Sequence, residues 1–383
     1  MKNLLAAAHL PRVRPDIWLL STLVVIGCLG LVMVGSSSVA VADRLSGDPM
    51  YFFYRQTVYA LIGLIIAFAV LHVPTRVLAA NTFTMLGAGL AMLVIVLIPG
   101  IGHSVNGAQR WIDLGPVALQ VSEPARLCLV LYIAGYASRR QLDLAHTWAG
   151  LFRPMTFLVI ACFLMLLEPD FGAGAILVAV AGIILFIAGA RLFNLIVLGA
   201  VAAVALAALV FSSPYRMERL VSFSDPWAHP FASGFQLTQS LIAIGRGHVF
   251  GVGLGNSVQK LSYLPETHTD FLFAIYAEEF GLLGSLVLVG LFSIVVWRGF
   301  VVARRAINVG QFFGGFLAYG LSGWLSLQAF VNMAVNMGLL PTKGLTLPLM
   351  SYGGSSLVMM CTLCALILRV DLESAAAVRE QTR

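Results

Sequence analysis

Long apolar runs separated by polar connections dominate the sequence. Most of these runs have about 18 residues or more, enough for a helix to cross ~30 Å of hydrocarbon. Lipid offers no partners to backbone polar groups, so only helices or closed barrels span it. We therefore predict ten membrane-spanning helices, at 17–37, 56–75, 79–99, 117–137, 154–168, 172–190, 192–212, 271–297, 311–331 and 353–370.

The composition agrees with a membrane protein. The chain of 383 residues is 60% hydrophobic and only 10% charged, and its mean hydropathy is +0.93. Soluble domains are closer to half apolar. These values exclude an ordinary soluble domain and predict one all-α polytopic membrane domain over residues 1–383.

The basic residues set the predicted orientation. Lys and Arg concentrate in connections on the side of the N-terminus, as at Arg139–Arg140 and Arg304–Arg305. Cytoplasmic connections of membrane proteins carry this excess. We therefore place both termini in the cytoplasm and residues 213–270 in one large extracytoplasmic loop between the seventh and eighth helices. The net charge of +6 then reports topology and predicts no nucleic-acid partner.

Polar chemistry gathers in three outward segments, at 100–126, 213–270 and 332–356, together with the short connection 168–172. Within the long loop, the apolar spacing of residues 235–244 predicts a helix lying in the plane of the membrane interface.

Residues 264–271 end the long loop and include Glu266, His268 and Asp270. A carboxylate at such a boundary meets water on one side and a low-dielectric wall on the other, which suits a general base. Capping of the eighth helix accounts for Asp270 equally simply. Glu266 and His268 are either capping partners, solvated loop residues or substrate contacts.

Several ionisable groups fall inside or beside the predicted helices. Glu123 and Arg126 are three residues apart and can pair on one helix face. Glu278 and Glu279 lie two to three turns into the eighth helix, where carboxylates usually face the protein interior. A structural pair with Arg126 or Arg110 and a contact with substrate both explain these glutamates.

Two further groups of residues suggest an outward cavity. Arg110, Arg126, Lys260 and Lys343 are suited to holding an anionic group such as pyrophosphate. The polar, glycine-rich residues 351–356 must line a cavity or re-enter the protein, because lipid would leave their backbone unsatisfied.

Four motifs together resemble the SEDS family (shape, elongation, division, sporulation) of bacterial wall synthesis. They are Asn106-Gly107-Ala108 with Arg110-Trp111-Ile112, Pro169-Asp170-Phe171-Gly172, Leu264-Pro265-Glu266-Thr267-His268-Thr269-Asp270-Phe271, and Ser351-Tyr352-Gly353-Gly354-Ser355-Ser356. The resemblance covers nearly the whole chain. The run from Thr342 to Pro348 is more similar to the division branch of the family than to its elongation branch.

The resemblance implies a peptidoglycan glycosyltransferase that polymerises lipid II at the division septum, in the bacterial cytoplasmic (inner) membrane. Asp270 matches the family's essential aspartate. The implied partners are lipid II, a division-specific class B penicillin-binding protein acting as transpeptidase, and other divisome membrane proteins. We expect substrate contacts at Arg110, Glu123, Arg126, Lys260, Glu266, His268, Lys343, Ser351 and Ser355.

The chemistry of this reaction suits the predicted layout. A base takes the proton of the acceptor 4-hydroxyl as it attacks the donor anomeric carbon, and positive charge stabilises the departing undecaprenyl pyrophosphate. A divalent cation such as Mg²⁺ could share the leaving-group role beside Glu266 or Asp270. The sequence has no clear metal-ligand cluster, and we expect no organic cofactor.

Two alternatives stay open from the residues alone. A lipid II flippase would need polar groups distributed through the membrane depth, whereas the polar groups of this chain gather on the outer side. A non-catalytic divisome scaffold would explain the helices but leaves the acidic outer segments without a role.

Overall fold

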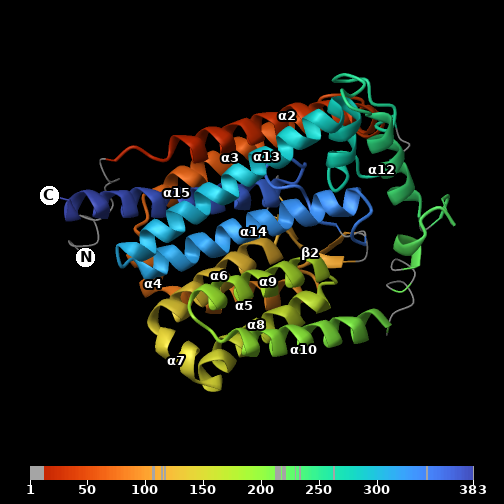
Figure 1. Ribbon diagram of the computed structural model, residues 1–383. Helices are drawn as coiled ribbons and strands as arrows, with labels where there is room; N and C mark the ends of the chain where they lie inside the picture. The colour runs from red at the N-terminus through yellow and green to blue at the C-terminus, as the bar shows by residue number, and fades with distance from the viewer. Residues whose placement is uncertain are drawn as a thin grey trace.

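The computed structural model describes residues 13–105, 108–113, 115, 118–211, 217, 221–228, 230–232, 234–261, 264–341 and 344–382, which form a bundle of long helices (Figure 1). The elements of the first half are α2 (Ile17–Ser46), α3 (Tyr51–Leu71), α4 (Thr75–Ala80), α5 (Thr82–Val96), β1 (His103–Val105), β2 (Ala108–Asp113), β3 (Ala118–Gln120), α6 (Ser122–Arg139) and α7 (Gln141–His146). Those of the second half are α8 (Trp148–Leu167), α9 (Phe171–Ile187), α10 (Leu192–Phe211), α12 (Phe235–Arg246), α13 (Leu272–Asn308), α14 (Phe312–Asn336) and α15 (Gly354–Gln381).

Each of the predicted apolar runs coincides with one helix, namely α2, α3, α5, α6, α8, α9, α10, α13, α14 or α15. By length and composition, five helices among the described residues could cross a membrane: α2, α3, α8, α13 and α15. The helices α5, α9 and α10 are apolar but shorter. The chain is therefore a mostly helical, multi-pass membrane protein.

The expectation of an all-α chain was incomplete. Strands β1, β2 and β3 form a small antiparallel sheet in that order, with Trp111 opposite Gln120 and Asp113 opposite Ala118. The helix predicted from residue 117 therefore begins at Ser122. Ala118 and Leu119 extended the apolar run toward the N-terminus, but their backbone pairs with β2 and is not helical.

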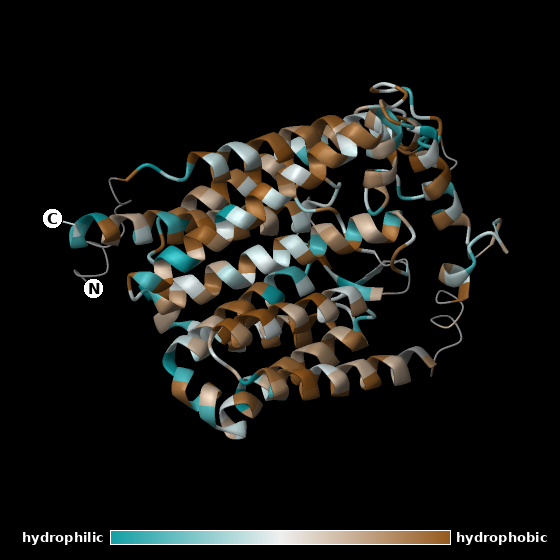
Figure 2. Ribbon diagram, in the orientation of Figure 1, coloured by the Kyte–Doolittle hydropathy of each residue, from teal (hydrophilic) through white to brown (hydrophobic). Residues whose placement is uncertain are grey.

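The centre of the bundle is formed by α6, α14 and α15, which bury residues around most of their circumference. Trp324 of α14 is among the largest fully buried side chains. At the edge of the bundle, α10 is apolar along its length (Figure 2), yet most of its described side chains are exposed. Such a helix is stable only where lipid covers it.

The beginning of α2 and the end of α15 lie together, at what we call the terminal end of the bundle (Figure 1). There Arg298 pairs with Asp16, and Arg305 Nη1 lies 2.8 Å from Asp371 Oδ1. The backbone N–H of Asp16 also donates to Asp371 Oδ2 over 2.8 Å. These contacts tie α2, α13 and α15 together. The opposite end, which carries α12 and the sheet, is called the loop end.

Two features of the loop end bear on function. The helix predicted at 235–244 is confirmed as α12, which buries Leu237, Thr238, Ser240 and Ala243; its alignment with the membrane plane stays a prediction. The second feature was not predicted: α13 is interrupted at Gly281, with φ 66° and ψ −162°. Residues 272–280 therefore form a short segment separate from the long helix that follows.

Candidate functional site

The segment that carries Asp270 is a series of turns docked on the bundle. Leu264, Thr267 and His268 are buried, whereas Glu266 is exposed and has a φ of 55°. The Thr267 hydroxyl donates to the Ser37 carbonyl of α2 over 3.1 Å. The loop therefore delivers Asp270 to a fixed place rather than to open solvent.

The backbone of Asp270 is anchored by two asparagines of α14. Its carbonyl accepts hydrogen bonds from Asn332 Nδ2 at 2.9 Å and Asn336 Nδ2 at 3.0 Å. Asn336 Oδ1 also accepts from the Ala274 N–H, over 3.2 Å. The N-cap of α13 is Phe271, whose side chain makes no capping bond. Asp270 precedes the N-cap position, so capping from that position does not explain the presence of this acid.

The carboxyl of Asp270 faces the backbone that precedes the re-entrant segment. A Cβ added at Gly344 would lie 3.2 Å from Asp270 Oδ2, so a side chain at this position would crowd the acid. The neighbouring Lys343, predicted to bind substrate, lies outside the described residues.

His268, two residues before this acid, is buried against aromatic rings. Its ring centroid lies 4.5 Å from that of Phe52 and 5.5 Å from that of Tyr352, and its carbonyl accepts from the Tyr352 N–H over 2.7 Å. Burial lowers the pKa of the imidazole, against the opposing charge of Glu266. A lowered pKa favours the neutral ring, which can hydrogen-bond a sugar without adding charge.

Residues 351–356, called the re-entrant segment, pack inside the protein, which is one of the two alternatives that their composition left open. Ser351 Oγ accepts from the Leu347 N–H over 2.9 Å, and Gln56 of α3 donates to the Ser351 carbonyl over 3.1 Å. Ser355 Oγ donates to the Ala118 carbonyl over 2.8 Å and accepts from the Gln120 N–H over 2.9 Å. Both hydroxyls therefore hold the segment against its neighbours, and their contact with substrate stays a prediction.

A second polar centre, not predicted as a site, lies at the start of α9. Asp170 accepts hydrogen bonds from Ser122 Oγ at 2.8 Å and Gln120 Nε2 at 3.2 Å, and its side chain caps α9 through the Ala173 N–H. Gln120 thus joins Asp170 to Ser355. The signal in the sequence was two acids, Glu168 and Asp170, between two apolar runs.

Glu168 is fully buried, and neither of its carboxyl oxygens has a hydrogen-bond partner among the described residues. Burial and the nearby Asp170 raise the pKa of Glu168 to about 8, while Arg110 acts in the opposite direction. Glu168 is therefore predominantly a neutral acid at pH 7, which lessens the cost of burying it without a partner.

The predicted pair within α6 is confirmed. Arg126 Nη2 lies 2.5 Å from Glu123 Oε1, and both side chains are buried. The guanidinium carbon of Arg126 also lies 4.6 Å from the ring centroid of Trp324. Its Nε and Nη1, and the second oxygen of Glu123, have no partner within the described part of the chain. Their contact with substrate stays a prediction.

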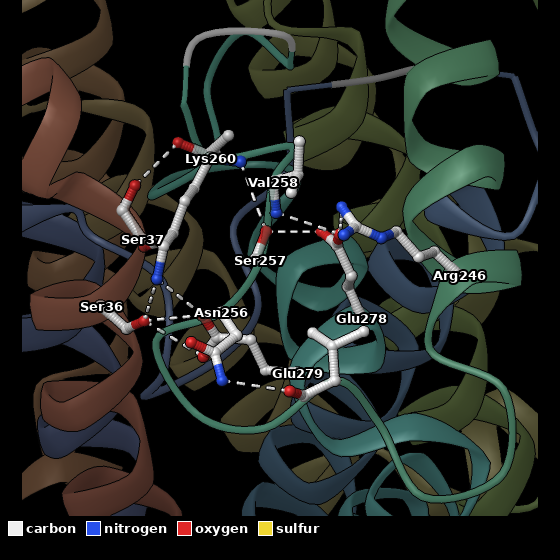
Figure 3. Close-up of polar contacts among 11 residues, drawn as sticks. Ser36, Ser37, Arg246, Asn256, Ser257, Val258, Lys260, Glu278 and Glu279 are labelled. Carbon is white, nitrogen blue, oxygen red and sulfur yellow. Dashed lines mark hydrogen bonds and ion pairs between the residues drawn. The ribbon is translucent and has the colours of Figure 1, made fainter.

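Glu278 and Glu279 are indeed structurally paired, but with partners other than Arg126 or Arg110. Glu278 binds Arg246 of α12, and Glu279 binds Lys260 of the long loop, at N–O distances of 3.2 and 2.9 Å (Figure 3). The positive charge of Lys260, which was predicted to contact substrate, is thus already balanced by Glu279. Arg110 lies on β2, half-buried, at the sheet beside Glu168.

No group of three or more His, Cys, Asp or Glu side chains that could hold a metal ion comes together within the described ranges. The divalent cation considered from the sequence stays a prediction, and no step below is routed through it.

Comparisons with known proteins show the family of the chain. A family model described as cell cycle protein, FTSW_RODA_SPOVE, matches residues 17–376. The chain is 54% identical to a probable peptidoglycan glycosyltransferase FtsW from Thioalkalivibrio sulfidiphilus, covering 93% of this chain and 88% of the relative. It is 52% identical to a protein of the same name from Nitrosococcus halophilus, covering 94% and 93%.

Solved structures with the same fold are also similar in sequence. A chain from a peptidoglycan synthase complex that coordinates polymerization and crosslinking has a TM-score of 0.79 and 29% identity, over 94% of this chain and 99% of that one. The rod shape determining protein RodA of Thermus thermophilus has a TM-score of 0.70 and 29% identity, over 94% and 97%.

Proposed function

Because the chain belongs to the FtsW, RodA and SpoVE family of cell cycle proteins, we propose that it is a peptidoglycan glycosyltransferase that polymerises lipid II, with Asp270 as the general base. One observation carries the assignment of the site. Segments distant in the sequence, which we propose to face outward, lie against Asp270: Asn332 and Asn336 of α14 bind its carbonyl, and Gly344 lies close to its carboxyl.

The proposed step transfers one proton and exchanges one bond. The Asp270 carboxylate takes the proton of the acceptor 4-hydroxyl while that oxygen bonds to the donor anomeric carbon. The bond from this carbon to the pyrophosphate oxygen breaks, and undecaprenyl pyrophosphate leaves with the electron pair. A positioned base of this kind accelerates reactions by about 10²–10⁴-fold. The backbone anchor from Asn332 and Asn336 supplies the positioning.

Positive charge for the leaving group is proposed to come from Arg110 and Lys343. Arg110 suits the role because it is half-buried and its Nε has no partner in the described part of the chain. Arg126 is already paired with Glu123, so we assign it to shaping the cavity. Glu266 is exposed beside Asp270 and fits a contact with an acceptor sugar.

The lipid part of the substrate is proposed to follow the apolar surface near this site. A groove of about 140 Å³ lies between α9 and α14, lined by Gly172, Ile176, Leu327, Val331 and Leu345. Its Leu345 also presents its carbonyl to Asn332 at 2.6 Å, which connects the groove to the anchor of Asp270. An isoprenoid chain matches such an apolar lining.

The finer topology and partners belong to the same proposal. We place ten spans in the inner membrane, with both termini cytoplasmic and residues 213–270 outside, following the distribution of Lys and Arg. A division-specific class B penicillin-binding protein and other divisome proteins are the proposed partners at the septum. A divalent cation beside the pyrophosphate remains part of the proposal.

The experiment reconstitutes the full chain with its cognate class B penicillin-binding protein in liposomes that contain labelled lipid II. We expect glycan polymer, detected by gel, with undecaprenyl pyrophosphate released in step. Transport of the lipid II headgroup without polymer would contradict the proposal and favour the flippase. If the folded complex produces no polymer and transports no headgroup, the scaffold alternative is favoured.

A further inference from the structure

The break at Gly281 separates residues 272–280 from the long part of α13 (Figure 1). A helix interruption leaves backbone groups without their usual partners, and the loop 248–253 supplies them. The N–H groups of Val252 and Gly253 donate to the carbonyls of Glu278 and Glu279, each over 3.0 Å. On the other side of the break, Leu282 and Leu283 donate to the carbonyls of His248 and Val249.

The side chains of Glu278 and Glu279 hold the same segment from two directions (Figure 3). Successive helical residues point about 100° apart. Glu278 accepts from Ser257 Oγ at 2.5 Å and from the Val258 N–H at 3.1 Å, in addition to its pair with Arg246. All of these partners belong to α12 or to the loop that follows it.

Glu279 faces α2 instead. Its Oε1 lies 2.9 Å from Lys260 Nζ and 2.8 Å from Ser36 Oγ, and Lys260 Nζ also donates to Ser36 Oγ over 3.0 Å. Both glutamates are essentially inaccessible, at 0% and 1% exposure. Removal of one partner would leave a buried carboxylate uncompensated, so these contacts define one rotation of the segment about its axis.

At its other end the segment begins beside Asp270. About two helical turns, or ~12 Å, separate the glutamates from this acid. Asn336 joins the start of this region to α14, because it binds both the Asp270 carbonyl and the Ala274 N–H. A rotation or shift of residues 272–280 would therefore move the backbone that carries Asp270.

We propose that Glu278 and Glu279 are positioning residues for Asp270: through Arg246, Lys260 and Ser36 they fix the orientation of residues 272–280 and so the place of the acid. The inference rests on the proposed function, since it assigns a purpose to the place of Asp270. It also gives Lys260 a structural task in place of the substrate contact expected from the sequence.

The test uses the full chain in complex with its cognate transpeptidase. Glu279→Gln and Lys260→Met each break the pair while keeping a side chain of similar size. Because small misplacement of a catalytic group can cost on the order of 10²-fold, we expect kcat for lipid II polymerisation to fall by about 10–100-fold. KM should change by less than about threefold, since ground-state binding is retained.

Two matched variants separate positioning from stability. Asp371→Asn breaks a comparably buried pair, with Arg305 at the terminal end, and should leave the kcat of the folded protein unchanged. The double exchange Lys260→Glu with Glu279→Lys restores an ion pair in reverse and should recover much of the lost kcat. Ser36→Ala keeps the ion pair and loses only the contact with α2, so it serves if the other variants fail to fold.

A readout independent of activity accompanies the kinetics. Amide hydrogen exchange in residues 272–280 should be faster in Glu279→Gln, and in Ser36→Ala, than in the wild type. Unchanged kcat and unchanged exchange in the folded single variants, or a loss no larger than that of Asp371→Asn, would overturn the positioning role. If Asp270→Asn retained full activity, the base assignment would fail instead, so the two failures are distinguishable.

Discussion

The backbone of Asp270 is anchored to α14, whereas three buried glutamates of the loop end form ion pairs through their side chains. Its carbonyl accepts the two asparagine amides, but Glu123, Glu278 and Glu279 form ion pairs with their carboxylates. Substitution of the Asp270 side chain therefore leaves the asparagine anchor in place.

Glu168 provides a prediction about pH. Its pKa of about 8 in the folded chain lies above the ordinary value of 4.5. Below pH 4.5 Glu168 is protonated in both the folded and the unfolded chain, and its contribution to the stability of the folded chain is fully present. As the pH rises toward 8, the folded state retains a proton that the unfolded state has lost, so this contribution declines. Glu168→Gln should remove the decline.

The measurement is the thermal unfolding midpoint of wild type and Glu168→Gln in the same detergent between pH 5 and 9. We expect the two midpoints to be similar near pH 5, with the variant increasingly more stable as the pH rises toward 8 and the difference levelling off above that pH. A constant difference across this range would contradict the raised pKa. Asp170 and Arg110 face Glu168, so both remain unchanged in this comparison.

At the scale of single residues, the sequence pointed to several of the buried ionisable groups but not to all of their ion-pair partners. The pair of Glu123 with Arg126 followed from helical spacing. The partners of Glu278 and Glu279 could not be inferred, because the sequence does not show where α12, which carries Arg246, packs, and Lys260 lies on a loop without a periodic pattern. Lys343 lies outside the described residues, so its contact with the leaving group stays a prediction.

The helices of the bundle were predictable because hydrocarbon requires long apolar runs, and each of these runs forms one helix. The elements at the loop end were less predictable. The apolar residues Ala118 and Leu119 belong to β3 rather than to the helix that follows. The interruption of α13 depends on backbone pairing with residues 248–253, and apolar periodicity does not register such pairing. Tertiary contacts therefore decided both elements.

Close packing where α15 begins gives a prediction at this scale. A Cβ at Gly354 would lie 2.6 to 2.8 Å from ring atoms of Tyr59, so either the buried ring of Tyr59 or the start of α15 would have to shift. We expect Gly354→Ala to destabilise the folded chain by about 1–3 kcal/mol through overpacking. The change should also disturb Ser355, which connects the re-entrant segment to the sheet.

Gly182→Ala is the matched control, since this glycine lies within α9 with nothing near an added Cβ. It should be neutral or should stabilise the chain by up to about 1 kcal/mol. Detergent thermal unfolding compares the two variants directly. Equal stability of both would mean that α15 and α3 do not meet closely at Gly354.

The whole molecule has its charged contacts arranged differently at its two ends. At the terminal end, Asp16 and Asp371 join α2, α13 and α15 through arginines. At the loop end, by contrast, buried polar atoms of Glu168 and Arg126 have no hydrogen-bond partner within the described part of the chain. This asymmetry suits a protein whose chemistry lies on one side of the membrane, whereas the orientation inferred from Lys and Arg stays a prediction.

Cysteine labelling in intact cells tests that orientation. Asp48 and Leu142 are both exposed, in the connections after α2 and within α7. With the N-terminus inside, a membrane-impermeant maleimide should label Asp48→Cys from outside and Leu142→Cys only after permeabilisation. The wild type, with its five free cysteines, gives the background. The reverse pattern would contradict the proposed topology.

The central claim is that Asp270 removes the proton of the acceptor hydroxyl. Its most direct test is the initial rate of lipid II polymerisation by purified Asp270→Asn in complex with the cognate transpeptidase, measured beside wild type. Asparagine keeps the size of the side chain but cannot take the proton, so kcat should fall by at least about 10²-fold while the complex stays folded. A rate within about threefold of wild type, well short of that loss, would contradict the claim.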